Sequence, residues 1–227
     1  MSTVTIKPYW PENQDGTTYY PVNHRLVKET QNAKIVDVFI EKATKEPPHT
    51  HQPHSVMFVD YDTPLTVRLV AEDGQEQIVF KKETAKRDEL LVDHMDPEPY
   101  HYVENNQPMH HYFAVRVENP EGKQMPFEKG VNPQNRAPSD KPYALWTVRV
   151  PENCSLSLKT EDFEGVLVAG KNSAFKAHQL LFDNEAALSP FELRGEKRLS
   201  IWHLPHSNSF RVENRKNEAE TLYFLPV

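Results

Sequence analysis

The stretch His101-Tyr102-Val103-Glu104-Asn105 decides how this chain is interpreted, because part of it recurs near the C-terminus. Val103-Glu104-Asn105 returns as Val212-Glu213-Asn214, and Phe210 stands in the position that His101 has in the first copy. The asparagines are 109 residues apart (214 − 105), and a second similar pair of segments, 55–59 and 165–169, is 110 residues apart (165 − 55). Nearly equal offsets at two separate places indicate an internal repeat. We therefore expect a duplicated chain that keeps this histidine in one copy only.

Short runs of β-branched and aromatic residues, separated by turn-forming residues such as Asp73-Gly74, dominate the chain. This pattern is typical of strands joined by tight turns. We expect strands at 35–40, 55–61, 65–70, 77–80, 111–117, 146–150, 155–158, 165–168, 198–203, 209–212 and 221–225. A single short helix is expected at 183–187. Many short strands at this spacing predict an all-β sandwich or barrel.

The predicted organisation has four parts. Residues 119–142 contain several prolines and no alternating pattern, so they are interpreted as a Pro-rich linker. The linker separates an N-terminal domain, 34–118, from a C-terminal domain, 143–227. Residues 1–33 are expected to be an N-terminal extension that packs on the barrels.

Composition narrows the class of protein. The net charge is −7 without a basic cluster, which disfavours binding to nucleic acid. No run approaches the roughly 20 apolar residues of a membrane span, and residues 1–15 lack the apolar segment of a secretory signal. These observations predict a cytoplasmic protein that does not bind membranes. The single cysteine, Cys154, excludes an internal disulfide and is expected to be at least half-buried in a strand.

His49-Thr50-His51 is a candidate metal-binding pair. Side chains alternate between the two faces of a strand, so His49 and His51 would share one face. Imidazole is the commonest metal ligand, and His101 could complete the site from a later strand. His54 is a candidate fourth ligand if the intervening Gln52-Pro53 turn breaks the alternation. The same histidines could also simply line a barrel interior without metal.

These two histidine segments resemble the two signature segments of the cupin superfamily, and the repeat resembles a bicupin with a degenerate second domain. The resemblance implies two antiparallel jelly-roll barrels. It also implies that His49, His51 and His101 bind a divalent transition metal, with Fe(II) favoured and Zn, Ni, Mn or Cu as alternatives. The glutamate ligand of the family is expected near position 55 or 56, where this chain has Ser55-Val56. Only the three histidine ligands can therefore be carried over.

Cupins with three-histidine sites resemble non-haem iron dioxygenases, so the implied activity is oxidation of a small molecule. Three neutral imidazoles leave the charge of a divalent ion uncompensated and several coordination positions open, which favours a small anionic substrate. His111 is a candidate for proton transfer, and Tyr61 for closing the pocket mouth. By alternation, Tyr102 should point away from the site. The alternatives are a non-catalytic small-molecule-binding or structural bicupin and a metal-assisted isomerase.

The second copy is not expected to bind metal. Phe210 replaces the histidine, and the positions equivalent to His49 and His51 are predicted near Lys159 and Glu161, which form no ligand pair. Edge strands of such barrels can pair across a dimer, so a homodimer is a further expectation.

Overall fold

The computed structural model describes residues 24–46, 48–51, 54–60, 66–71, 73–81, 90–96, 100–106, 111–118, 120, 122–128, 130–170, 172–194 and 199–227. At 60, 79–81, 91, 111–116 and 118 it describes the backbone alone. The described residues form strands, bridges and turns without a helix, so the all-β prediction is confirmed. No candidate for a membrane-spanning helix occurs among them.

The chain divides into two compact units. One comprises the residues up to Thr30 together with Lys34–Glu118, and the other comprises Gln31–Ala33 together with Asn119–Val227. Part of the segment interpreted as a linker, 119–142, belongs to the second unit's fold. Phe127 is buried in the second core, and Gln134 and Asn135 form a short strand of a second-unit sheet.

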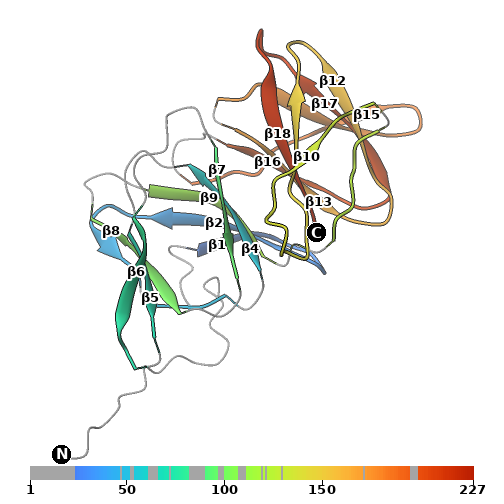
Figure 1. The fold of residues 1–227 in the computed structure, drawn as a ribbon. Helices are drawn as coiled ribbons and strands as arrows, with labels where there is room; N and C mark the ends of the chain where they lie inside the picture. The colour runs from blue at the N-terminus through green and yellow to red at the C-terminus, as the bar shows by residue number, and fades with distance from the viewer. Residues whose placement is uncertain are drawn as a thin grey trace, which may run out of the picture. The chain divides into compact units, whose positions relative to one another are not determined.

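The first unit consists of two antiparallel sheets, which Figure 1 shows as separate layers. The larger sheet has the order β1-β2-β9-β4-β7, and its strands are β1 (His24–Glu29), β2 (Lys34–Ile40), β9 (His111–Glu118), β4 (Ser55–Asp60) and β7 (Leu91–Met95). The smaller sheet has the order β3-β8-β5-β6, and its strands are β3 (Thr44–Lys45), β8 (His101–Asn105), β5 (Thr66–Val70) and β6 (Glu76–Lys81).

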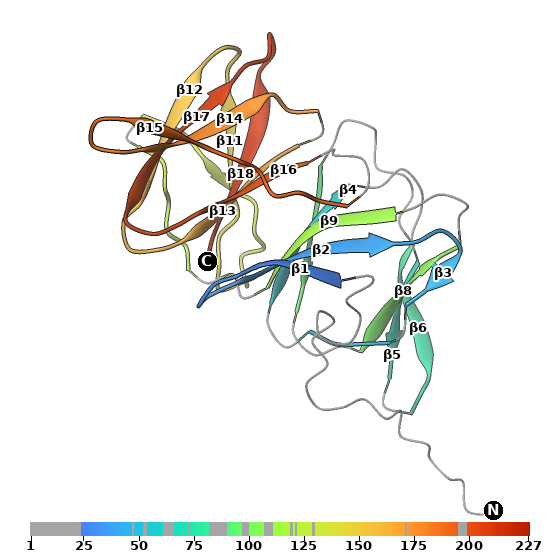
Figure 2. The same cartoon turned by 180° about the vertical axis from the view of Figure 1, so that it is seen from behind.

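The second unit, seen from behind in Figure 2, repeats this plan. Its larger sheet has the order β10-β11-β18-β13-β16, and its strands are β10 (Gln134–Asn135), β11 (Trp146–Val150), β18 (Glu220–Pro226), β13 (Gly165–Ala169) and β16 (Ser200–Leu204). Its smaller sheet has the order β12-β17-β14-β15, and its strands are β12 (Ser155–Thr160), β17 (Asn208–Asn214), β14 (Phe175–Leu180) and β15 (Glu185–Leu188).

The two units share one topology. The orders β1-β2-β9-β4-β7 and β3-β8-β5-β6 recur as β10-β11-β18-β13-β16 and β12-β17-β14-β15, so nine consecutive strands connect in the same way in both units. Two four-stranded antiparallel sheets with this connectivity form a jelly roll. The prediction of two jelly-roll barrels from a duplicated chain is therefore confirmed.

The repeated Val-Glu-Asn motif has the same structural role in both units. Val103 and Val212 are buried in the two cores. The buried amide of Asn105 donates to the carbonyl oxygens of the last residue of β2 and the residue after it, at 3.5 and 3.0 Å. Asn214 donates to the corresponding two carbonyls at the end of β11, at 3.1 Å each. The motif thus ties the smaller sheet of each unit to an end of the larger one.

Two local predictions are wrong. The segment 183–187, expected to be a helix, contributes to β15, which pairs with β14 across a turn closed by the Leu181 N–H and the Asn184 carbonyl at 2.8 Å. The helix-forming residues of Glu185–Leu188 are overridden by strand pairing. Cys154 is exposed and immediately precedes β12, so it is neither in that strand nor half-buried.

The two cores are filled differently. The second core contains buried aromatic rings, including Phe210, Phe224 and Trp202. In the first unit, one buried cluster consists of aliphatic side chains, namely Val36, Val38, Ile40, Met57, Val59 and Val103. The buried rings of Phe58 and Tyr102 do not belong to it. The interior of the first unit contains a group of histidines beside this aliphatic cluster.

Candidate metal centre

Backbone pairing brings the predicted histidines together. His49 and His101 form an isolated antiparallel bridge, with reciprocal N–H to carbonyl hydrogen bonds of 2.8 and 2.9 Å. Their ring centroids are 4.6 Å apart. The ring of His51, two residues further along, lies 4.9 Å from that of His49 and 5.2 Å from that of His101. The structure therefore gathers the three histidines that the sequence singled out.

A fourth histidine, His24, joins this group and was missed in the sequence. His24 begins β1 and pairs with Val38 of β2, whose side chain lies in the core. Directly paired residues share a sheet face, so the His24 ring is directed inward. Its centroid is 4.8 Å from that of His49 and 5.7 Å from that of His51. No His-x-His spacing marks this residue, and only the pairing of β1 with β2 reveals it.

The arrangement fits a shared metal ion. One nitrogen from each of His24, His49 and His51 lies within 4.8 Å of the others. His101 is not a member of this group of nitrogens, although its ring lies beside those of His49 and His51. Imidazole nitrogens bind transition metals at about 2.1 Å, so rings that share one ion have centroids roughly 4.5–5.3 Å apart. Four of the five centroid distances lie in this range, between 4.6 and 5.2 Å, and the fifth, between His24 and His51, is longer at 5.7 Å. All four rings, including that of His101, are at most 1% exposed. The donor set and its geometry therefore suit a divalent transition metal.

A buried carboxylate stands beside the imidazoles. Glu46, just after β3, is 1% exposed. Its Oε1 lies 3.7 Å from Nδ1 of His24, and its Oε2 accepts a hydrogen bond of 3.3 Å from the N–H of Val103 in β8. No sequence pattern pointed to this group, because Glu46 lies before the His-x-His segment rather than after it.

The remaining candidates have different outcomes. His54 is not part of the grouped nitrogens; its Nδ1 lies 3.3 Å from the carboxylate of Asp96. Tyr61 lies outside the described residues. His111 begins β9, but its side chain is not described. The roles suggested for Tyr61 and His111 therefore stay predictions.

Ser55 occupies the position where the cupin resemblance predicted a carboxylate. It begins β4, is fully buried, and pairs with Met95 of β7 and Glu118 of β9. A hydroxyl carries no charge at neutral pH. The negative charge nearest to the imidazoles among the described buried residues is therefore on Glu46, which lies next to His24.

Tyr102 points to the opposite side of β8, as predicted. Its hydroxyl donates a 2.7 Å hydrogen bond to Oε2 of Glu76, and Nζ of Lys45 lies 4.0 Å from the ring centroid. The hydrogen bond from Tyr102 is the main reason that the pKa of Glu76 is lowered. Burial, followed by the bond to Glu76, raises the pKa of Tyr102. This polar cluster belongs to the outer face of the smaller sheet.

In the second unit, no histidine stands at the positions that correspond to His49, His51 and His101. The positions predicted to correspond to His49 and His51 are each one residue too late in the sequence. Phe210, the counterpart of His101, pairs with Leu158, so Leu158 corresponds to His49 and Thr160 to His51. Leu158 is fully buried, and the hydroxyl of Thr160 donates to the carbonyl of Pro205 at 2.6 Å. Lys159 and Glu161, the predicted equivalents, are exposed. A shift of one residue exchanges the two faces of a strand.

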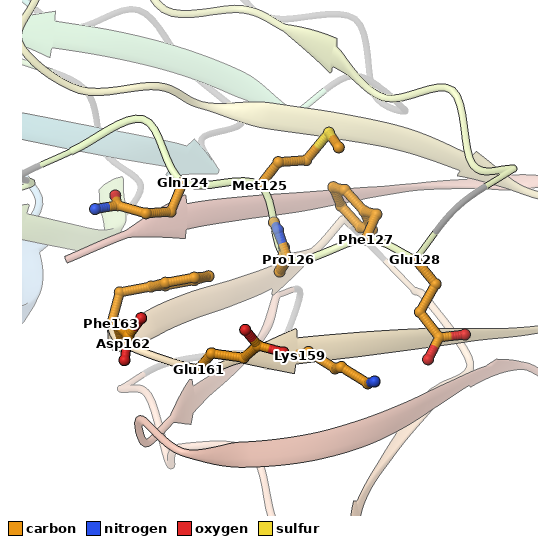
Figure 3. Close-up of a pocket in the computed structure, with 9 residues that line it drawn as sticks. All are labelled: Gln124, Met125, Pro126, Phe127, Glu128, Lys159, Glu161, Asp162 and Phe163. Atoms are coloured by element: carbon orange, nitrogen blue, oxygen red, sulfur yellow. The ribbon is translucent and has the colours of Figure 1, made fainter.

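A hollow of about 410 Å³ lies on the second unit (Figure 3). There the segment 124–128 runs beside the end of β12, and the N–H of Lys159 donates to the carbonyl of Pro126 at 2.7 Å. Lys159 and Glu161 line this hollow together with Phe127 and Phe163. Its lining contains no histidine, so it is separate from the metal-binding candidates.

Comparison with known proteins shows similarity at the level of fold. No family model matches the chain, and no curated protein matches it. The cupin 2 conserved barrel domain protein from Leptotrichia buccalis superposes with a TM-score of 0.52 at 9% identity, covering 90% of this chain and 88% of that one.

Two further solved structures match to a similar degree. Salicylate 1,2-dioxygenase from Pseudaminobacter salicylatoxidans has a TM-score of 0.53 at 9% identity, covering 86% of this chain and 70% of that one. The vicilin from Solanum melongena has a TM-score of 0.53 at 8% identity, covering 88% and 78%. These proteins include an enzyme and a vicilin, so the shared architecture does not by itself select an activity. The likenesses, with the repeated jelly-roll topology, show that this chain has the cupin fold in its two-barrel, bicupin form.

Proposed function

We propose that the first barrel binds one divalent transition metal through its buried histidines and uses it to oxidise a small anionic molecule. The observation that carries this proposal is the convergence of nitrogens from His24, His49 and His51 within 4.8 Å inside the barrel. His101 supplies a fourth ring next to His49 and His51. Polar rings are costly to bury unless their nitrogens are compensated, and a shared metal would compensate one nitrogen of each ring that binds it.

Fe(II) is the proposed metal, with Zn, Ni, Mn and Cu as alternatives. Imidazole suits all of these ions except Mn, which prefers oxygen ligands. Three or four imidazoles around a six-coordinate ion leave two or more positions for exchangeable ligands. When bound, such an ion supplies Lewis acidity and, if it is iron, redox chemistry with oxygen.

The protein's own groups determine what else can enter the site. Neutral imidazoles do not reduce the charge of a divalent ion, so the interior favours a ligand that brings negative charge. The aliphatic side chains of Val38 and Val103 lie in the core cluster of this barrel and exclude water from its interior. The vicilin from Solanum melongena holds different anionic ligands in structurally similar pockets, which supports an anion as the ligand class here.

A second candidate function is a non-catalytic bicupin with a structural metal. The observation that favours it is the burial of all four rings, each at most 1% exposed. Structural zinc sites are closed and four-coordinate, whereas catalytic sites keep an open position. Identifying the bound metal and counting its ligands would separate these two functions.

Metal analysis of protein purified without a histidine tag tests the proposal. We expect stoichiometric metal in the isolated protein, or a higher melting temperature when Fe(II) or Zn(II) is added, because an ion that binds only the folded state stabilises it. His101→Ala should weaken this binding. His206→Ala, which removes an exposed histidine of the second unit, should not.

Oxygen consumption by the Fe(II)-loaded protein, measured with a panel of small carboxylates and enolates, tests the catalytic part. Turnover that disappears in His101→Ala and persists in His206→Ala is the expected result. A protein that binds neither Fe(II) nor Zn(II) would refute the metal centre. A protein that binds metal with unchanged affinity in His101→Ala would refute the assignment of that ligand.

A further inference from the structure

Two acidic side chains are buried among the described residues, and they have different surroundings. Asp37 of β2 forms an ion pair of 2.9 Å with Arg25 of β1. Glu46 instead lies beside an imidazole, with its Oε1 3.7 Å from Nδ1 of His24. Burial of a carboxylate is costly unless a positive charge or hydrogen bonds compensate it. Glu46 therefore calls for a specific explanation in terms of His24 and the neighbouring rings.

Glu46 is held in place from two sides. Its own N–H donates to the carbonyl of Val103 at 2.9 Å, and the N–H of Val103 donates to its Oε2 at 3.3 Å. These contacts attach the carboxylate to β8, the strand that also carries His101. The other oxygen, Oε1, remains directed at His24.

The two nitrogens of His24 can thus have separate tasks. Nδ1 faces Glu46 at 3.7 Å, which is an ion-pair contact and longer than a hydrogen bond. We therefore assign Nε2 to the group of nitrogens that His24 forms with His49 and His51. Glu46 contacts the Nδ1 side of His24 and is not itself a member of that group of nearby ligand atoms. A carboxylate that accepts the second N–H of a metal-binding histidine orients the ring and makes it a stronger ligand.

From this geometry we infer that Glu46 is a positioning residue of the metal centre and acts through His24, a ligand supplied by β1. The inference rests on the metal centre proposed above. With Glu46 included, the divalent ion, the neutral imidazoles and the carboxylate together carry a net charge of about +1 rather than +2. Because it supplies His24, β1 is also an essential part of the centre; the corresponding edge strand of the second unit is β10, which carries no histidine.

The test measures Zn(II) and Co(II) dissociation constants by chelator competition, on the full chain. Glu46→Gln keeps an oxygen for the Val103 N–H but removes the charge, and we expect roughly 10–100-fold weaker binding together with a changed Co(II) absorption spectrum. Asp37→Asn is the matched control, since it removes the other buried carboxylate. It should leave the metal dissociation constant within about twofold of the wild-type value, even if the variant is less stable than the wild type.

A double-mutant cycle separates an effect through His24 from a general loss of structure. In the His24→Gln background, Glu46→Gln should weaken metal binding no further, because the ring that Glu46 positions is gone. Equal losses in both backgrounds, or no loss in either, would overturn the inference while leaving the metal centre intact. Wild-type protein that binds neither ion would overturn both. Urea unfolding of each metal-free variant confirms that folded proteins are being compared.

Discussion

Two asparagines show how a repeated motif can be structural rather than catalytic. Asn105 and Asn214 are both fully or almost fully buried, and each donates its side-chain amide to the carbonyls at the end of a strand in the opposite sheet. The oxygen of Asn214 also accepts the N–H of Lys216 at 3.0 Å. Buried carbonyls need such donors, because an unsatisfied one costs about 1–3 kcal/mol. The recurrence of the motif therefore reflects a joint between sheets that both barrels require.

Substitution of either asparagine should destabilise the protein. We expect Asn214→Ala and Asn105→Ala each to lower the free energy of unfolding by roughly 2 kcal/mol, because buried carbonyls lose their donor. Asn→Asp should be more harmful, since it places a carboxylate against carbonyl oxygens. Urea unfolding checks this, with the exposed Asn106→Ala as the control. A loss in Asn105→Ala no larger than that in the control would contradict the proposed joint.

At the level of elements, the outer face of the smaller first-unit sheet contains a network of alternating charges. Arg68 of β5 donates to Glu104 of β8 at 3.1 Å and lies 3.8 Å from Glu76 of β6. Lys45 of β3 lies 3.7 Å from Glu76, which also accepts the hydroxyl of Tyr102. The network links all four strands of this sheet. It stabilises the sheet that carries His101 without contributing to the metal centre.

The network predicts a pH dependence of stability. The pKa of Glu76 is lowered in the folded protein, chiefly by the Tyr102 hydrogen bond, so folding favours its charged form. The stabilisation is fully present above the ordinary pKa of 4.5 and is lost as the pH falls through the lower folded value.

Unfolding free energies of wild type and Glu76→Gln therefore should differ more at about pH 6 than at about pH 3. Glu152→Gln, an exposed carboxylate of the second unit, is the control and should show little difference at either pH. If the difference in unfolding free energy between wild type and Glu76→Gln does not become smaller on acidification, Glu76 is not the source of the pH dependence. When Tyr102 is replaced by Phe, most of the pH-dependent part of the difference in unfolding free energy caused by Glu76→Gln should disappear.

At the scale of the whole molecule, one topology has two different interiors. The first barrel contains four buried histidines beside aliphatic residues, and the second fills the corresponding region with side chains such as Phe210 and Leu158. A Cβ atom on Gly165, the counterpart of Ser55, would lie only 2.2 Å from the ring of Phe224. The second barrel is therefore a packed hydrophobic core without space or ligands for the same centre.

This difference predicts one metal ion per chain. Hydrogen exchange with and without Zn(II) should show added protection in the first unit, including β1 and β8, and unchanged protection in the second-unit strands β12 and β17. Metal analysis should give about one equivalent, since among the described residues only the first barrel brings several imidazoles together. Two equivalents, or protection that rises in β12 and β17, would show that the second barrel also binds metal.

The sequence by itself determined the all-β class, the duplication and the pairing of His49 and His51 with His101. These features depend on local alternation and on a repeat offset, which are visible along the chain. Only the tertiary structure decided that His24 and Glu46 join the imidazoles, that Leu158 and Thr160 replace them in the second barrel, and that Glu185–Leu188 is a strand. Each of these depends on which strands pair and in what register, and a shift of one residue reverses the face that a side chain occupies.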